Sequence, residues 1–535
     1  MIRKIRTQVL WAVIAATGVL IWLGGAWLYG LIATVPLALL GLRDLVQTRH
    51  SLLRNYPIVG HLRYLIEGTG AELRQYIVES NTEGRPFNRD MRSLIYQRAK
   101  NVSDKKPFGT ELDVYETGYG WLAHSMTPKT ICEHPEKLFR IDVGGEETTQ
   151  PYSCSVFNVS AMSFGSLSGA AIHSLNSGAA KGGFAHNTGE GGISKYHRAG
   201  GGDLIWQIGT GYFGCRNSEG GFDAGLFKQH ACEPQVKMIE IKISQGAKPG
   251  HGGILPGKKV TEEIAEARKV PVGKTVYSPA FHTAFSTPIG LLEYVRELRT
   301  LSGGKPVGFK LCVGRPHEFF AVCKAMHQTG IRPDFITVDG GEGGTGAAPI
   351  EFSDRIGLPL KEALIFVHNA LVGIDVRKQV RVAAAGKLVS AFHLASAHAM
   401  GADWCNSARG FMFSLGCIQA QSCHTNECPV GIATQSARLA RGVVVSDKGE
   451  RVYHFQRNTV EALAEVVAAA GLGHPNELRP SHIMERTSQT EIRTLARLYE
   501  FYEPGQLLEG KANDLLQRHW DMAQAETFAP IEHQS

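Results

Sequence analysis

Eight short runs rich in β-branched and apolar residues occupy residues 150–410, and they constrain the fold more than any other feature. Most of them end in Gly or polar residues, and most precede a segment with helical periodicity. The runs begin near Val156, Gly183, Leu204, Lys237, Pro306, Asp334, Val380 and Asp403. Eight strands that alternate with helices predict an α/β fold, a (β/α)8 TIM barrel. The alternative is an open doubly wound sheet, but a count of eight favours closure.

Glycine-rich and polar residues follow these runs, at the end of the strands where barrel enzymes place their chemistry. Backbone N–H groups in such loops can approach a phosphate or a planar ring. One such loop would be an ordinary tight turn, whereas several at the same end of successive strands indicate a cofactor site. The loop at 341–346, GEGGTG, formally matches G-x-G-x-x-G. Because Pro349 follows it and no helix opens at the glycines, NAD(P)H or ATP binding within this chain is not expected.

Three of the ten cysteines form a cluster with the spacing C-x5-C-x4-C: Cys417, Cys423 and Cys428, the last followed by Pro429. The chain is neither short nor Cys-dense, so a reducing compartment and a metal site fit better than a disulfide scaffold. Structural zinc normally needs four ligands, and His424, adjacent to Cys423, is a poor fourth. The spacing therefore predicts a [3Fe–4S] cluster; three buried reduced thiols are the alternative.

Residues 9–42 contain no charged residue, a stretch of 34 residues. A single membrane span needs about 20, and a signal peptide's apolar region is only ~7–15 long. The Gly24-Gly25 pair and Pro36 interrupt the stretch, which predicts two short helices folded as a membrane hairpin. One longer tilted helix and a buried core helix are the alternatives.

Basic residues flank this stretch on both sides: Arg3, Lys4, Arg6, Arg43, Arg49 and Arg54. A hairpin would place both flanks on the cytoplasmic side, as the positive-inside rule prefers. We therefore expect a protein of the cell membrane with its catalytic domain on the cytoplasmic side.

Composition excludes some other classes. Of 535 residues, 20% are charged and 43% apolar, which is ordinary for a folded protein and argues against disorder. The net charge of +6 comes from basic residues dispersed along the chain. Because no basic, aromatic-interleaved stripe is present, a nucleic-acid partner is not expected.

Residues 151–435 resemble the FMN-binding synthase domain of glutamate synthases. The matching stretches are AMSFGSLS (161–168), NTGEGG (187–192), QGAKPGHGG (245–253), VDGGEGGTGAAP (338–349) and LGCIQAQSCHTNECPVGIATQ (415–435). The last is long and contains the cysteine spacing, which makes it specific. The stretch at 47–65 looks like the start of the shorter, single-domain members, some of which carry a membrane segment in front.

This resemblance implies a barrel that holds FMN beside a [3Fe–4S] cluster. In that family 2-oxoglutarate and ammonia condense to 2-iminoglutarate, which reduced FMN converts to L-glutamate. Electrons arrive through the iron–sulfur cluster from ferredoxin or from an NAD(P)H-oxidising flavoprotein subunit. The resemblance thus implies a glutamate synthase-like oxidoreductase acting on a small 2-oxo acid.

The flavin needs a cation near its N1 and C2 carbonyl. Lys310 is the candidate because it lies inside an apolar strand, although a surface lysine is the alternative. Arg409 is the expected charge partner of the phosphate, with a salt bridge beneath the cluster as its alternative. The full set expected to bind cofactor is Met162, Ser163, Gln207, Lys310, Gly343, Gly344, Gly386, Arg409 and Gly410.

A dianionic 2-oxo acid needs cationic anchors. Lys195 and Lys248 are the candidates, and Glu190 lies in the loop that resembles the family's substrate loop. Each of the three could instead be a solvated loop charge. We assign all three to the catalytic site.

Two departures from the family pattern bear on function. The glutaminase domain, which begins with a nucleophilic cysteine, is not seen, so ammonia is expected to come free or from a separate glutaminase subunit. In addition, Tyr212 stands where an Arg is expected to hold the 2-oxoglutarate carboxylate. A phenol cannot form the bidentate pair of an Arg, which leaves open a 2-oxo acid other than 2-oxoglutarate. On this interpretation Tyr212→Arg improves the use of 2-oxoglutarate.

The sequence predicts four regions: a membrane anchor at 1–45, an extension packing on the barrel at 46–149, the barrel at 150–440 and a helical region at 441–535. Three functions remain open. The first is amination of a 2-oxo acid, and the second is FMN and iron–sulfur chemistry on another substrate, coupled to a membrane redox partner. The third, a non-catalytic membrane-bound redox or scaffold protein, does not explain Lys310 and the full set of loops.

Overall fold

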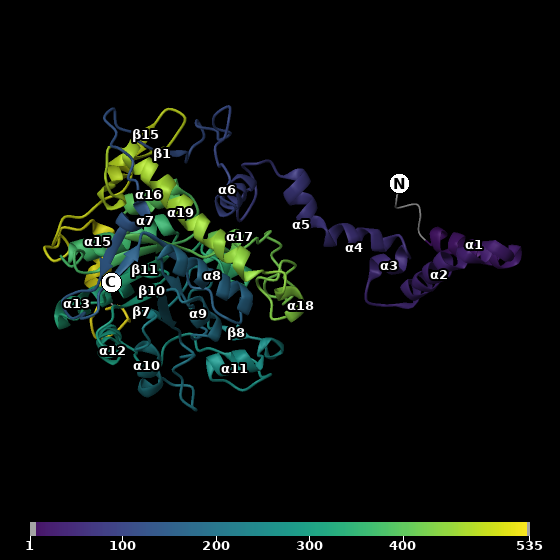
Figure 1. Cartoon of the computed structure of the whole chain (residues 1–535), viewed down its shortest axis with the longest axis horizontal. Helices are drawn as coiled ribbons and strands as arrows, with labels where there is room; N and C mark the ends of the chain where they lie inside the picture. The colour runs from purple at the N-terminus through teal and green to yellow at the C-terminus, as the bar shows by residue number, and fades with distance from the viewer. Residues whose placement is uncertain (1–6, 532–535) are drawn as a thin grey trace. The chain divides into compact units, whose positions relative to one another are not determined.

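The computed structural model describes residues 7–531, and the chain divides into two compact units, Met1–Arg89 and Asp90–Ser535 (Figure 1). This division falls inside the segment 46–149 that the sequence assigned to an extension of the barrel. Residues 46–89 therefore belong to the same unit as the apolar N-terminal segment.

The N-terminal unit begins with a helical hairpin formed by α1 (Gln8–Leu23), η2 (Gly25–Gly30) and α2 (Leu31–Val46). Gly24 and Gly25 form the turn with φ of 64° and 56°, in the left-handed region that favours glycine. The two arms pack closely, since a Cβ on Gly41 would lie 2.4 Å from Leu10 Cδ1. Among residues 7–531, Gly25–Val46 is the one helix long and apolar enough to cross a membrane; α1 is apolar but shorter.

The hairpin is followed by short helices: α3 (Ser51–Asn55), α4 (Gly60–Gly68), α5 (Gly70–Leu73) and the π-helical turn η3 (Arg74–Val78).

The second unit contains a closed barrel of eight parallel strands, which confirms the predicted fold. The strands are β4 (Phe157–Val159), β5 (His186–Asn187), β6 (Leu204–Ile208), β7 (Val236–Lys242), β10 (Val307–Leu311), β11 (Phe335–Asp339), β12 (Arg381–Ala385) and β13 (Trp404–Ser407). Each lies in one of the eight predicted runs, and β13 pairs with β4 to close the barrel. The strands are buried almost throughout, as in other all-parallel sheets.

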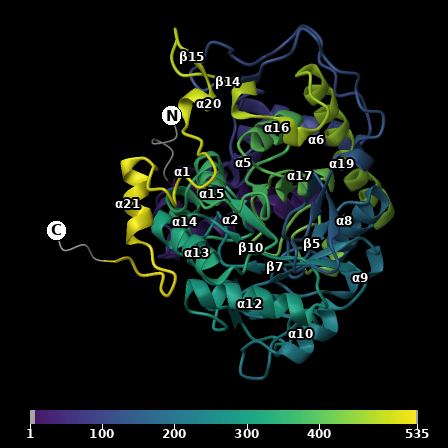
Figure 2. The same ribbon diagram turned by 90° about the vertical axis from the view of Figure 1, so that its left-hand side faces the viewer.

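Helices surround these strands in both views (Figures 1 and 2). They are α8 (Gly169–Gly182), α9 (Lys195–Gly200), α10 (Ala224–Ala231), α12 (Pro288–Leu301), α13 (Pro316–Thr329), α15 (Leu360–Gly373), α16 (Ala391–Ala399) and α17 (Arg409–Ser414). Local sequence sets where several begin: Ser168, Asp223, Thr287 and Ser390 accept backbone N–H groups of the first turn of α8, α10, α12 and α16.

Two insertions at the carboxyl ends of the strands form the surroundings of the site. Between β7 and α12 lie β8 (Ile254–Leu255), η4 (Gly257–Lys259), α11 (Glu262–Arg268) and β9 (Val276–Tyr277); after β11 comes α14 (Ile350–Arg355). The two insertions approach closely, because a Cβ on Gly246 would lie 1.7 Å from the carbonyl oxygen of Gly340.

The remaining elements pack outside the barrel. Before it lie α6 (Arg89–Ala99), β1 (Gly120–Leu122), α7 (Pro135–Leu138), β2 (Arg140–Val143) and β3 (Tyr152–Ser155). After it lie α18 (Ala437–Ala440), α19 (Val445–Ala469), η5 (Pro475–Glu477), η6 (Pro480–His482), β14 (Ile483–Arg486), β15 (Ile492–Thr494), α20 (Leu495–Leu498) and α21 (Asp514–Met522). The C-terminal region is therefore not only helical, since β14 pairs with β1 and β15 in a small antiparallel sheet.

Candidate active site

Two buried lysines stand side by side at the carboxyl ends of neighbouring barrel strands. Lys242 of β7 is the register partner of Lys310 of β10. Each forms its own ion pair: Lys242 Nζ lies 2.9 Å from Glu190 Oε2, and Lys310 Nζ lies 3.1 Å from Asp339 Oδ2. Both pairs are at the end of the barrel where enzymes of this fold act.

Glu190, in the loop after β5, interacts electrostatically with three cations. Burial works against its ionisation, but Lys242, Lys248 and Arg268 outweigh burial and hold the pKa of the carboxyl below its usual range. Three positive charges and one negative charge leave two positive charges in the group. Glu190, Lys242 and Lys248 also line one small pocket, together with Pro279 and Ala280.

Arg268 was missed by the sequence analysis. It ends α11, is 5% exposed and lies with its Cζ 4.9 Å from the ring centre of Phe213. Its Nη2 donates to the carbonyl of Phe164 at 3.0 Å, while its Nε has no hydrogen-bond partner among residues 7–531. Burial lowers the pKa of Arg268 to about 10, and Glu190 opposes that shift. Nothing in the helical stretch EEIAEAR distinguishes this Arg from a surface one.

The structure separates Lys195 from this group. Its Nζ lies 2.6 Å from Glu263 Oε1 at an exposed position at the start of α9, and it lines a different surface pocket. The ion pair with Glu263 accounts for the charge of Lys195 without a substrate. The two other predicted residues, Glu190 and Lys248, do lie together.

A fully buried carboxylate, Glu240 of β7, organises the middle of the barrel. It accepts hydrogen bonds from Asn187 Nδ2 at 2.8 Å, Gln207 Nε2 at 2.7 Å and Thr337 Oγ1 at 2.6 Å. Because a carboxylate only accepts, the NH2 side of the Gln207 amide must face Glu240. The carbonyl side of Gln207 is thereby oriented away from Glu240.

Lys310 stays protonated in this setting. Burial disfavours its charge, but Asp339 and Glu240 outweigh burial and raise its pKa. Asp339 is held in turn by the backbone N–H of Gly246 at 3.0 Å. Lys242 and Glu240 carry the same sequence signal that identified Lys310, a charged residue inside an apolar strand, so that signal could have found them too.

Three glycines of the set expected to bind cofactor leave little room for a side chain. A Cβ on Gly344 would lie 2.8 Å from Arg409 Nε, and one on Gly410 would lie 2.6 Å from Ser407 Oγ. Gly386 has a φ of 149°. Arg409 Nη2 donates to the carbonyl of Glu342 at 2.8 Å, so this guanidinium joins the loops after β11 and β13.

The loop of Glu190 packs directly on the segment that follows β4. A Cβ on Gly189 would lie 2.7 Å from the backbone N of Ser163 and 3.1 Å from that of Met162. Gly343 continues the loop after β11, and its N–H donates to the carbonyl of Gly340 at 2.8 Å. The chemistry of this donor set, with permanent cations and close-approach glycines at one end of the barrel, fits a phosphorylated flavin.

Tyr212 is fully buried and does not line the pocket of Glu190. Its hydroxyl accepts from the backbone N–H groups of Thr283 at 3.0 Å and Ala284 at 2.9 Å, and it lies 3.2 Å from His282 Nδ1. His282 Nε2 lies 2.9 Å from the carbonyl of Lys242 and donates to it. Burial lowers the pKa of His282 to about 4, so the ring is neutral and Nδ1 accepts from Tyr212. Tyr212 therefore fastens the loop after β9 to the end of β7.

The three clustered cysteines follow α17 in one loop. Cys428 is buried, and Cys417 and Cys423 are partly exposed. The carbonyl of Cys417 accepts from Tyr96 Oη at 2.5 Å, and that of Cys423 accepts from Lys259 Nζ at 3.3 Å. Among residues 7–531 no three His, Cys, Asp or Glu side chains are arranged to hold a single metal ion.

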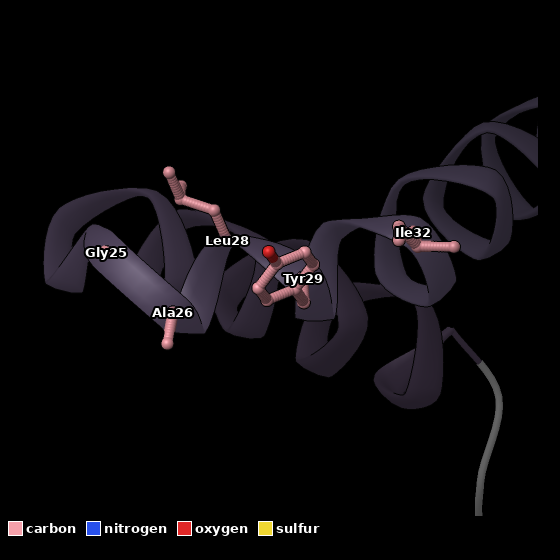
Figure 3. Close-up of a pocket in the computed structure, with 5 residues that line it drawn as sticks. All are labelled: Gly25, Ala26, Leu28, Tyr29 and Ile32. Atoms are coloured by element: carbon pink, nitrogen blue, oxygen red, sulfur yellow. The ribbon is translucent and has the colours of Figure 1, made fainter.

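A hollow at the turn of the hairpin offers no comparable chemistry. Gly25, Ala26, Leu28, Tyr29 and Ile32 line it, and Figure 3 shows that Tyr29 supplies its one polar side chain. The barrel end is therefore the candidate active site.

Residues 133–473 match the family described as the conserved region in glutamate synthase. The chain belongs to the glutamate synthase family. Among its relatives, the glutamate synthase large subunit-like protein YerD of Bacillus subtilis is 38% identical over 514 residues, which cover 88% of this chain and 97% of that protein.

Other members match a smaller part of the chain. The archaeal-type glutamate synthase [NADPH] of Thermotoga neapolitana is 34% identical over 320 residues, 60% of each chain. The ferredoxin-dependent glutamate synthase 2 of Synechocystis is 38% identical over 205 residues, which cover 38% of this chain and 13% of that protein. The protein is thus a glutamate synthase-like oxidoreductase.

Proposed function

We propose that the protein reductively aminates 2-oxoglutarate with ammonia. The observation that carries this proposal is the net charge of two positive units around Glu190, which complements the two negative charges of a 2-oxo dicarboxylate. Tyr212, buried and committed to its own hydrogen bonds, gives no reason to expect another 2-oxo acid. The name of the Thermotoga relative supports the same reaction class.

The side chains have distinct roles in this proposal. Lys242, Lys248 and Arg268 bind the carboxylates of the substrate, and Glu190 holds Lys242 in position. FMN, when bound, supplies the hydride that reduces the imine carbon. Gly344, Gly386, Gly410 and Arg409 would hold its phosphate, while Lys310 and Gln207, together with Met162 and Ser163, would face its ring.

Electrons enter, on this proposal, through a [3Fe–4S] cluster held by Cys417, Cys423 and Cys428. The donor is ferredoxin or a separate NAD(P)H-oxidising flavoprotein subunit, as the names of the two groups of relatives suggest. Ammonia is taken from solution or from a separate glutaminase subunit. The apolar hairpin anchors the protein in the cell membrane, with the barrel on the cytoplasmic side.

The deciding experiment is anaerobic reoxidation of the photoreduced, detergent-purified protein. Addition of 2-oxoglutarate plus ammonia should reoxidise the flavin and yield one glutamate per two electrons, whereas either compound alone should not. Slow reoxidation by this pair and fast reoxidation by a membrane quinone would contradict the proposal. That result would favour the second candidate, an oxidoreductase coupled to a membrane redox partner, for which the apolar hairpin is the supporting observation.

We predict that iron and acid-labile sulfide are present in a ratio near three to four. Changing Cys417, Cys423 or Cys428 to Ser should remove the paramagnetic signal of the oxidised cluster, because thiolates are its ligands. Cys405→Ser is the matched control, since Cys405 is buried in β13 away from the loop. An unchanged signal in all three cluster variants would refute the assignment.

The apparent affinity for 2-oxoglutarate should fall at high pH, which would appear as a higher KM. Burial lowers the pKa of Lys248 below its ordinary value, the charge of Lys242 adds to that effect, and Glu190 opposes it. The protonated form binds the anion, so the KM for 2-oxoglutarate should rise as pH passes upward through this lowered pKa. Lys248→Arg should move the rise to higher pH, because a guanidinium keeps its proton. A profile that is identical in the two proteins would exclude Lys248 as the titrating group.

A further inference from the structure

Figure 1 shows α4 and α5 after the hairpin, and an exposed apolar stripe runs along α4, α5 and η3. Its residues recur at helical spacings of three, four and seven and are all exposed: Leu62, Leu65, Ile66, Leu73, Tyr76 and Ile77. Leu65 is 65% exposed and Ile77 74%. Arg63, Glu67 and Arg74 lie together on a separate, charged side of the helix at the same periodicity. Exposed apolar surface of this extent marks an interaction site.

A buried carboxylate fixes where this stripe begins. Asp44, in the last turn of α2, is 1% exposed and accepts from the backbone N–H of Ile58 at 3.0 Å. His61 Nε2, in the first turn of α4, lies 2.9 Å from the same carboxylate oxygen. These bonds hold the start of α4 at the base of the hairpin, the end at which α2 finishes, and not at the turn formed by Gly24 and Gly25.

We propose that residues 60–78 lie on the membrane surface, with the apolar stripe inserted at the boundary between headgroups and acyl chains. This inference rests on the proposed insertion of the hairpin in a bilayer. Each hairpin arm of 16 residues is about 24 Å long, close to the ~30 Å core of a bilayer. With the hairpin inserted, its base lies at the headgroup level, and so does the start of α4.

The charges beside the stripe favour a bilayer, rather than a second copy of the chain, as the surface that the stripe binds. Arg43, Arg49 and Arg54 are exposed around the hairpin base, where they complement anionic headgroups. Two identical copies would bring these like charges together. An exposed tyrosine in the stripe, Tyr76, is also typical of the membrane–water interface.

The test uses the full chain reconstituted in vesicles of phosphatidylethanolamine and phosphatidylglycerol. A photoactivatable p-benzoylphenylalanine replaces Ile66 or Ile77 on the stripe, and Glu67 or Arg74 on the charged side provides the matched controls. After irradiation, mass spectrometry identifies what each position is joined to. Lipid adducts should form several-fold more at 66 and 77 than at 67 and 74.

Extraction at alkaline pH separates this inference from the proposed anchoring. If the protein stays in the membrane pellet but positions 66 and 77 give no more lipid adduct than 67 and 74, the stripe is not inserted and the inference is wrong. Protein–protein adducts at 66 and 77 would instead assign the stripe to another subunit. Release of the protein into the supernatant would refute the anchoring itself, and the stripe inference with it.

Discussion

Lys242→Met should lower kcat/KM for 2-oxoglutarate by about 10²–10³-fold, the equivalent of a few kcal/mol lost with one partner of a buried charge pair. The substrate loses one of its cations. Glu190 also loses the ammonium 2.9 Å away that compensates its charge. The double variant Lys242→Met/Glu190→Gln should recover the stability lost by the single variant but not its activity, because only the uncompensated charge has been removed.

Lys237→Met is the matched control for this prediction. Lys237 lies near the opposite end of the same strand, partly exposed and 3.7 Å from Asp203. Its removal should leave kcat/KM unchanged, since an exposed pair of this kind contributes little. Activity of Lys242→Met within a few-fold of wild type would show that Lys242 does not bind the substrate.

Tyr212→Phe should lower the free energy of unfolding by about 1–3 kcal/mol and raise the KM for 2-oxoglutarate. The change leaves the N–H groups of Thr283 and Ala284 and the Nδ1 of His282 without their shared partner. The loop that they belong to carries Pro279 and Ala280, which line the same pocket as Glu190, Lys242 and Lys248. Chemical denaturation and initial-rate kinetics measure the two effects.

Tyr294→Phe is the control, because this buried Tyr packs against Phe222, as Tyr212 does. Its hydroxyl has no hydrogen-bond partner among the described residues, so its removal should be close to neutral. Tyr212→Arg, which the sequence interpretation expected to improve the use of 2-oxoglutarate, should instead destabilise the protein. A charged side chain would replace a phenol that is 0% exposed. Improved kinetics in that variant would restore the earlier interpretation.

The barrel could be predicted from the sequence because its strands are local signals. Each is a short apolar run bounded by turn residues, and eight of them in alternation with helices suit a closed parallel barrel. The close approach of the hairpin arms followed from Gly24-Gly25 in the middle of a charge-free stretch. The sequence placed the boundary after this segment at residue 45, however, whereas the compact N-terminal unit extends to Arg89.

What the sequence determined by itself is the fold class, the family and the residue types of the site, since these depend on periodicity and on motifs within short stretches. Only the tertiary structure decided which charges meet. It brought Lys242, Lys248 and Arg268 to Glu190 from a strand, a loop and a short helix, and it paired Lys195 with Glu263 on the surface. It also showed that the Tyr212 hydroxyl is hydrogen-bonded to the loop at 282–284, so Tyr212 does not take the place of a substrate-binding Arg. The register of neighbouring strands and the packing of loops bring such partners together. Neither can be predicted from the spacing of residues within one segment.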